Sequence, residues 1–302
     1  MSARADSTPF RGIFPYLVSP VDTSTGRVRE RALRLLVDHL IECGVHGLSP
    51  LGSTGEFPYL TFEQRAEVVR IVVDATAGRV PVVAGVSAFA TADAIRQAVR
   101  FRELGADGLV LILQTFFPVS ASGVEAYFRQ VAEAVDVPIC LYSNPGLLNA
   151  DLPPAVLDAL SYVPNIEYFK EASGNTGRIL TVMNRVGDRM QMFSASAHIP
   201  LVVFKLGGVG WMAGPACLLP RECVHLWELS QGGDWDEALR LQRRLWRLNE
   251  AFQKYSLAGC VKAGLEVQGF EVGDPIPPQE PLSREAIEDI RASLAAAQMV
   301  EA

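Results

Sequence analysis

One lysine in this chain is placed to act as a nucleophile. Lys170 ends the apolar run that starts at Ile166, and only four of the 27 basic residues are Lys, the other 23 being Arg. Burial disfavours an ammonium ion and lowers its pKa, and a neutral amine can condense with a ketone to form a Schiff base. The resulting iminium is an electron sink for making or breaking carbon–carbon bonds. The alternative is a strand-end lysine that extends to water.

Two further sets of residues have side chains that would complete such a site. Tyr142 ends another apolar run, and a phenol within reach of the amine and the substrate can relay protons; otherwise it is a core tyrosine. Ser53, Thr54 and Gly55 form a short turn whose N–H groups and hydroxyls could hold a carboxylate. The alternative for this turn is a plain connection that caps the next helix. Glu56 is expected to be structural.

Other catalytic motifs are absent from the sequence. There is no G-x-x-x-x-G-K-[ST] and no G-x-S-x-G, and the four histidines are scattered without an H-E-x-x-H. We therefore expect no metal site, which disfavours a metal-dependent aldolase. His198 follows a predicted strand and is a candidate substrate contact.

The elements that would position these residues alternate between short apolar runs and longer stretches with helical spacing. The predicted strands are 12–20, 45–53, 80–87, 107–113, 137–145, 166–174, 190–196 and 207–214. Eight strand–helix repeats predict an α/β protein with the (β/α)8 architecture of a TIM barrel, and the continuous apolar character of the strands fits a sheet covered on both faces. An open doubly wound sheet is the alternative. In a barrel, the ends of the strands meet at one face, where active sites form.

The alternation of predicted strands and helices ends near residue 233. Three helical stretches, 234–253, 256–269 and 283–298, follow with little strand between them. We predict a catalytic barrel over residues 1–233 and a C-terminal three-helix extension over residues 234–302.

The composition of the chain argues against some classes of binding partner and favours one cellular compartment. The net charge of −7 and the pI near 5.2 argue against nucleic-acid binding. Five Cys without a C-x-x-C favour a reducing compartment, and neither a signal peptide nor a window of about 18 apolar residues is present. We expect a cytoplasmic protein that does not bind a membrane.

Three motifs, taken together, resemble one known family. Gly52–Glu56, Tyr142-x-x-Pro145 and Lys170–Gly174, in this order and spacing, are similar to motifs of the dihydrodipicolinate synthase / N-acetylneuraminate lyase family. The resemblance covers nearly the whole chain. It implies a (β/α)8 barrel, a Schiff-base lysine, 2-oxo acid chemistry with pyruvate as donor or product, no metal or organic cofactor, and a homotetramer built from dimers, or a homodimer.

The resemblance also assigns roles by position. It implies that Lys170 forms the Schiff base and that Tyr142 relays protons, with Thr54 bridging to the phenol. Ser53 and Thr54, with the Gly55 amide, would hold the carboxylate of the keto acid. Finally, it implies that two residues line the pyruvate end of the pocket, Met212 and Ala195.

The sequence departs from the family pattern where specificity is set. The stretch 146–149 carries no Arg for a second carboxylate, 114–118 carries no Tyr, and Ala195–Ala197 replaces an Asp pair. Acidic residues that would meet the hydroxyls of sialic acid are missing too. These departures disfavour lysine biosynthesis and sialic acid as the function.

The altered positions suggest a pocket for a different partner. The candidate specificity residues are Phe116, Leu147, Ser196, His198 and Trp211, several of which are apolar. An apolar pocket cannot satisfy a second carboxylate, so they indicate an apolar partner. The form Tyr142-x-Asn144-Pro145 and the run Trp211–Ala216 resemble the hydratase-aldolases of arylidene-pyruvates, and this resemblance implies an aromatic aldehyde. The alternatives are 4-hydroxy-tetrahydrodipicolinate synthase proper, a keto-deoxy sugar-acid aldolase or dehydratase, and a catalytically inactive barrel that binds a metabolite.

Overall fold

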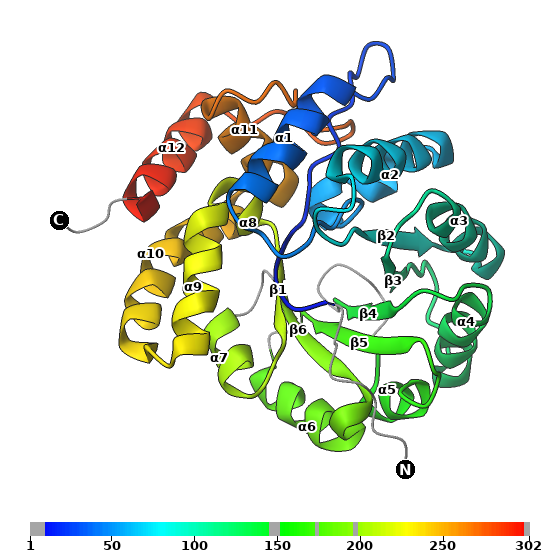
Figure 1. Ribbon diagram of the computed structural model, residues 1–302. Helices are drawn as coiled ribbons and strands as arrows, with labels where there is room; N and C mark the ends of the chain where they lie inside the picture. The colour runs from blue at the N-terminus through cyan, green and yellow to red at the C-terminus, as the bar shows by residue number, and fades with distance from the viewer. Residues whose placement is uncertain (1–9, 145–151, 173–174, 196–198, 299–302) are drawn as a thin grey trace.

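The core of the molecule is a curled sheet of parallel strands surrounded by helices (Figure 1). The computed structural model describes residues 10–144, 152–172, 175–195 and 199–298. Its seven strands follow the order β1-β7-β6-β5-β4-β3-β2, and each neighbouring pair is parallel. The strands are β1 Gly12–Pro15, β2 Val83–Ala88, β3 Gly108–Leu113, β4 Ile139–Ser143, β5 Ile166–Glu171, β6 Gln191–Ala195 and β7 Gly210–Ala213.

The run 45–53, predicted as a regular strand, is the exception. It forms only single bridges, Tyr16 with Ser49 and Leu48 with Val82. These contacts still close the sheet between β1 and β2, because the Ser49 amide donates to Pro15 and Leu48 accepts from the Val83 amide. A longer ladder is prevented by Pro50, which has no N–H, and by Leu51, whose φ of 63° is left-handed. The prediction of eight regular strands is therefore wrong for this run, whereas the parallel α/β barrel is confirmed.

Helices cover the outside of the barrel (Figure 1). The helix α2 illustrates how the sequence starts them, since Thr61 and Gln64 form a reciprocal capping box at its first turn. The helices that alternate with the strands are α1 Glu30–Glu42, α2 Phe62–Thr76, α3 Thr91–Glu103, α4 Ala121–Glu133, α5 Pro154–Leu160, α6 Thr176–Val186, α7 Pro200–Lys205, α8 Pro215–Leu218 and α9 Pro220–Gly232.

The chain after the barrel folds back onto it. Three helices follow, α10 Trp235–Lys254, α11 Leu257–Val267 and α12 Arg284–Gln298. Helix α11 contacts the short 3-10 helix η1, Ser53–Gly55, which is followed by a second one, η2, Phe57–Tyr59. A third, η3, spans Gly187–Arg189. The C-terminal helices thus border the turn that the sequence predicts to hold a carboxylate.

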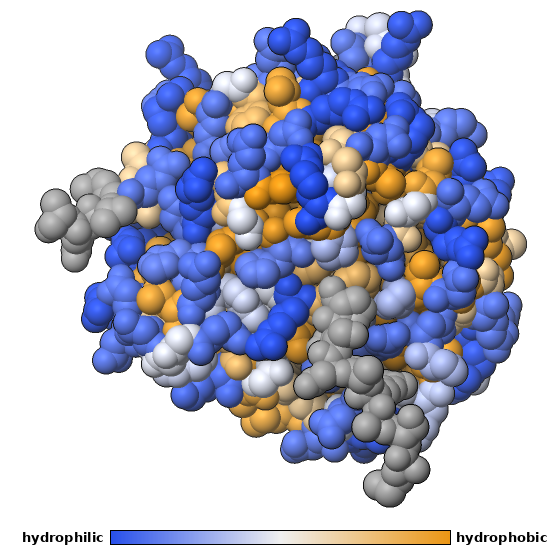
Figure 2. Space-filling model, viewed as in Figure 1, coloured by the Kyte–Doolittle hydropathy of each residue, from blue (hydrophilic) through white to orange (hydrophobic). Residues whose placement is uncertain are grey.

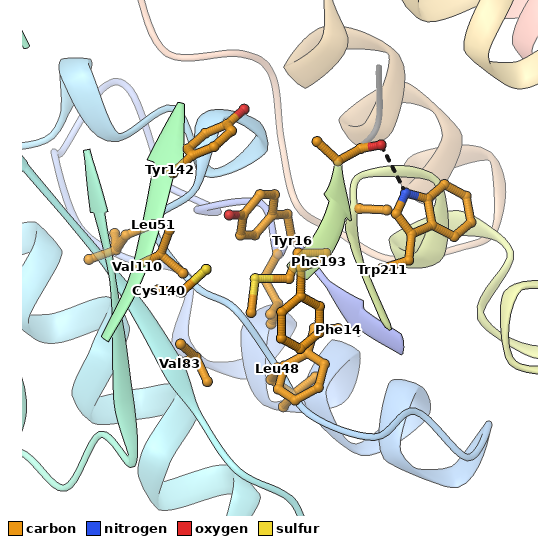
Figure 3. Close-up of a cluster of buried hydrophobic side chains, with 14 of the residues drawn as sticks. Phe14, Tyr16, Leu48, Leu51, Val83, Val110, Cys140, Tyr142, Phe193 and Trp211 are labelled. Carbon is orange, nitrogen blue, oxygen red and sulfur yellow. Dashed lines mark hydrogen bonds between the residues drawn. The ribbon is translucent and has the colours of Figure 1, made fainter. Parts of the chain in front are cut away.

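The interior of the barrel is packed with large side chains. Figure 3 shows Phe14, Tyr16, Val110, Tyr142 and Phe193 converging from different strands. On the face seen in Figure 2, hydrophilic residues predominate, with apolar residues exposed between them. Among the described residues, no helix combines the length and the apolar character that crossing a bilayer requires. The large buried side chains inside the barrel make its core a water-poor environment for any polar group placed there.

Candidate active site

Lys170 lies inside the barrel, on β5. Its Cα pairs with that of Tyr142 on β4, and the lysine is 1% exposed. The Nζ atom lies 3.8 Å from the centre of the Tyr142 ring and 3.9 Å from the centre of the Tyr16 ring. The structure therefore brings together the amine and the phenol that the sequence singles out, and it adds a second phenol.

The surroundings of Lys170 favour its neutral form. Burial holds the pKa of the Lys170 amine well below its ordinary value, and the Cys140 thiol opposes this only in part. The next residue, Glu171, directs its carboxylate at Arg178 of α6, with 2.8 Å between Oε2 and Nε. Burial thus favours the neutral amine, which is the form that acts as a nucleophile.

Tyr142 is held by two polar neighbours. Its phenol oxygen accepts a hydrogen bond from Asn144 Nδ2 at 2.8 Å, and the Ser53 side chain interacts with the same phenol. Burial raises the pKa of Tyr142, while these two hydrogen bonds lower it and the charge of Glu171 raises it further. These two polar neighbours orient the phenol for a proton relay and offset part of the rise in its pKa.

The turn after the run 45–53 folds as η1 and departs in two ways from the expected roles. Ser53, not Thr54, contacts the Tyr142 phenol. The Gly55 N–H donates to Gly52 at 2.9 Å, so this amide is already satisfied within the turn. Thr54 is fully buried, and its Oγ1 has no hydrogen-bond partner in the part of the chain that the structure describes. An unpaired buried hydroxyl is costly, so Thr54 Oγ1 is a candidate to bind a polar group, although Thr54 does not itself line the cavity that opens above Tyr142 and Ser53.

Glu56 anchors this turn to the C-terminal segment, in line with the structural role expected for it. It has a left-handed φ of 54° and is almost fully buried. Its Oε2 lies 2.5 Å from Nζ of Lys262 on α11, and its Oε1 accepts hydrogen bonds from the Ile276 amide at 2.6 Å and from Gln279 Nε2 at 2.8 Å. The sequence carries no local signal for this pairing.

A cavity of about 540 Å³ opens above Tyr142 and Ser53. Its apolar lining includes Phe57, Phe89 and Leu257. The charged side chain that lines it is Glu56, which is neutralised by Lys262. Among the described residues that line the cavity there is no Arg or Lys. This wall suits an apolar group better than a second carboxylate.

Two of the remaining sequence candidates lie at the end of the barrel interior and one does not. Met212 pairs in register with Ala195 and Phe14, and both Met212 and Ala195 are buried. Successive side chains of a strand point to opposite faces, so Trp211 lies on the face away from Met212. Its indole donates to the Ala195 carbonyl at 3.2 Å (Figure 3). The structure places Trp211 in the packing around the barrel, outside the cavity.

The loop after β3 exposes its aromatic residues. Phe116 is 77% exposed, packs edge-on against Phe117 and does not line the cavity, whereas the neighbouring Gln114 and Thr115 do. Three candidates, Leu147, Ser196 and His198, lie outside the described residues. Within residues 10–144, 152–172, 175–195 and 199–298, no three His, Cys, Asp or Glu side chains cluster to hold a metal ion.

Comparison with known proteins identifies the family of this chain. A sequence model of the dihydrodipicolinate synthetase family matches residues 9–297. The chain belongs to the dihydrodipicolinate synthetase family. The family resemblance drawn from the three motifs is thereby confirmed.

Relatives within the dihydrodipicolinate synthetase family match over almost their full length. The 4-hydroxy-tetrahydrodipicolinate synthase of Methanospirillum hungatei is 31% identical, covering 93% of this chain and 97% of the relative. That of Phenylobacterium zucineum is 33% identical, covering 94% and 96%. A crystal structure of a putative dihydrodipicolinate synthetase from Pseudomonas aeruginosa superposes with a TM-score of 0.92 at 29% identity, over 96% of this chain and 100% of the other.

Proposed function

We propose that this protein is a Schiff-base-forming lyase or aldolase that acts on a 2-oxo acid, with pyruvate as the donor or the product. The observation that carries the proposal is the Lys170 amine, buried in the barrel and 3.8 Å from the Tyr142 ring centre. A desolvated amine beside a phenol has both the nucleophile and the proton relay that imine chemistry needs.

The proposed reaction begins with attack of the Lys170 Nζ on the ketone carbon. The carbinolamine that forms takes a proton from the Tyr142 phenol and loses water, which leaves an iminium and a phenolate. The phenolate then removes a proton from C3, which gives the enamine and restores the phenol. The enamine adds to an aldehyde carbon, and the Tyr142 phenol protonates the alkoxide that forms, so that an iminium and a phenolate remain; hydrolysis of this iminium releases the proton that restores the phenol. The reverse sequence splits an aldol. Water finally hydrolyses the iminium and returns the free amine.

We assign the carboxylate of the 2-oxo acid to the hydroxyls of Ser53 and Thr54. Ser53 lines the cavity and touches the phenol, and the unpaired Thr54 Oγ1 would gain the partner that it lacks. Since the Gly55 N–H is already used within the turn, it has no part in this assignment. The steps need neither a metal nor an organic cofactor, and we expect full activity after treatment with a chelator.

For the second substrate we propose an apolar or aromatic aldehyde. The support is the lining of Phe57, Phe89 and Leu257 and the absence of Arg and Lys from the described cavity wall. A second candidate is 4-hydroxy-tetrahydrodipicolinate synthase, because the relatives named above carry that name. Keto-deoxy sugar-acid aldolase or dehydratase activity is the third. Measuring pyruvate release from arylidene-pyruvates and sugar acids, and condensation of pyruvate with aspartate semialdehyde, separates the three.

We also propose that the protein works as a homo-oligomer, a dimer or a tetramer, in the cytoplasm. The support for assembly is three exposed aromatic side chains: Phe89, which lines the cavity, and Phe116 and Phe117 in the loop after β3. Large exposed apolar groups in one region mark interaction surfaces. The support for the compartment is that all five cysteines are free and buried. Sedimentation of the wild type and of Phe116→Ser/Phe117→Ser tests the assembly.

The test of the function is borohydride trapping in the presence of pyruvate, followed by peptide mass spectrometry. We expect a reduced pyruvyl adduct on Lys170, and none on the Lys170→Met variant. An intact mass without any gain would contradict the proposed chemistry. A trapped adduct without turnover of any substrate in the panel would instead support the barrel that only binds a metabolite.

A further inference from the structure

Tyr16 is a buried aromatic residue that the reaction described above does not use. It follows β1 and is 2% exposed. The centre of its ring lies 3.9 Å from the Lys170 Nζ, nearly the same distance as the Tyr142 ring at 3.8 Å. The two rings come from β4 and from the end of β1, which are not neighbours in the sheet (Figure 3). The reacting nitrogen therefore contacts two aromatic faces that the fold holds independently.

The position of the Tyr16 ring is fixed by the backbone of the carboxylate-binding turn. A Cβ added at Gly52 would lie 2.8 Å from the Tyr16 ring, so only glycine leaves room for it. Gly52 directly precedes Ser53, and the Tyr16 Cα pairs with that of Ser49. The ring is thus wedged between this turn and the amine.

Schiff-base formation changes the charge at the nitrogen. Burial favours the neutral form of the free amine, whereas the iminium carries a positive charge on the same atom. The nearest acidic neighbour along the strand, Glu171, is engaged with Arg178. The negative face of an aromatic ring attracts a cation within about 6 Å of its centre, and the attraction is strongest where water is excluded.

We propose that Tyr16 is a second catalytic aromatic residue, whose ring face stabilises the Lys170 iminium. This inference rests on the proposed function. It assigns the effect to the π face of Tyr16 and not to its hydroxyl. Tyr142 supplies both a face and a proton, whereas Tyr16 supplies a face alone. The interaction is weaker with the neutral amine than with the cation, so it lowers the barrier to the iminium more than it stabilises the free enzyme.

The first test compares Tyr16→Phe with Tyr16→Leu. The phenylalanine variant keeps the ring, so we expect kcat and the rate of adduct trapping to stay within about threefold of wild type. The leucine variant loses the ring, and we expect both to fall about tenfold, which corresponds to about 1.4 kcal/mol, with little change in KM. Equal losses in both variants would assign the effect to the hydroxyl and overturn the proposal.

The second test keeps the shape of the ring and changes only its charge distribution. Phenylalanine, 4-fluorophenylalanine and 3,5-difluorophenylalanine are incorporated at position 16, and matched melting temperatures show that packing is unchanged. We expect the trapping rate to fall stepwise with each added fluorine. If the trapping rate is the same in all three variants and the adduct is still found on Lys170, the role of Tyr16 is contradicted but the proposed function is not. Wild-type protein that traps no adduct at all contradicts the function itself.

Discussion

Glu56 and Lys262, far apart in the chain, form a buried ion pair with 2.5 Å between Oε2 and Nζ. The pair joins the turn beneath the candidate carboxylate site to helix α11. Burial lowers the pKa of Lys262, and the nearby charge of Glu56 opposes this shift. Removing one partner leaves the other charge buried and unpaired.

The ion pair predicts a clear pattern of stability. We expect Glu56→Gln and Lys262→Met to lower the free energy of unfolding by about 3–5 kcal/mol each, and the double variant to recover a large part of this loss. Denaturant melts measure all three. The control is the exposed pair between Arg70 and Asp74, where Asp74→Asn should cost less than about 1 kcal/mol. Additive losses in the Glu56/Lys262 double variant would contradict the coupling.

Replacing the buried lysine should stabilise the protein in a pH-dependent way. The folded-state pKa of Lys170 lies below the ordinary value of 10.5, so between these two values the unfolded chain holds more protons and wild-type stability rises with pH. Lys170→Met removes this dependence. We expect the variant to be inactive but more stable at neutral pH, with an advantage that shrinks as the pH approaches 10.5. Urea melts at several pH values measure the free energy of unfolding of both proteins. A difference between them that does not change with pH would argue against a neutral buried amine.

Loss of the Tyr142 hydroxyl should separate binding from proton transfer. We expect Tyr142→Phe to lower kcat by roughly 10²–10⁴-fold, because general acid–base catalysis contributes about that much. The remaining ring still contacts Nζ, so a slow pyruvate adduct should form on Lys170. Single-turnover trapping and steady-state assays measure the two quantities. A variant with unchanged kcat would exclude Tyr142 as the relay.

Ser53 should tune the phenol. Its hydrogen bond lowers the pKa of Tyr142, so Ser53→Ala raises that pKa. Any limb of the kcat profile that reports ionisation of the phenol should then move to higher pH. The profile of Ser53→Thr, which keeps a hydroxyl, is the control. Identical profiles for Ala and wild type would mean that Ser53 does not act on the phenol.

Thr54 should matter for binding and not for stability. Since Oγ1 is buried without a partner among the described residues, Thr54→Val removes an unsatisfied group and should leave the melting temperature unchanged or higher. If the hydroxyl holds the carboxylate, the affinity for pyruvate should fall about tenfold, the equivalent of one hydrogen bond of about 1.4 kcal/mol. Calorimetric titration with pyruvate measures this, with Thr54→Ser as the variant expected to bind normally.

The sequence alone indicated the barrel and the centre of the site. Eight apolar runs separated by helical stretches fit a closed parallel sheet, and such a sheet brings the ends of its strands to one face. Lys170 and Tyr142 both end strands, so their proximity followed from the repeat. Their Cα atoms are paired in adjacent strands in the structure.

Tertiary structure decided which face of each strand points inward. Strands of a covered parallel sheet are apolar on both faces, so polar and apolar residues do not alternate along them. The sequence therefore does not show that Met212 lies in the barrel interior and Trp211 in the packing around the barrel. The same ambiguity hid Tyr16 within an apolar run. Only the closed sheet carries its ring to Lys170, because contacts across a barrel join residues that no local spacing relates.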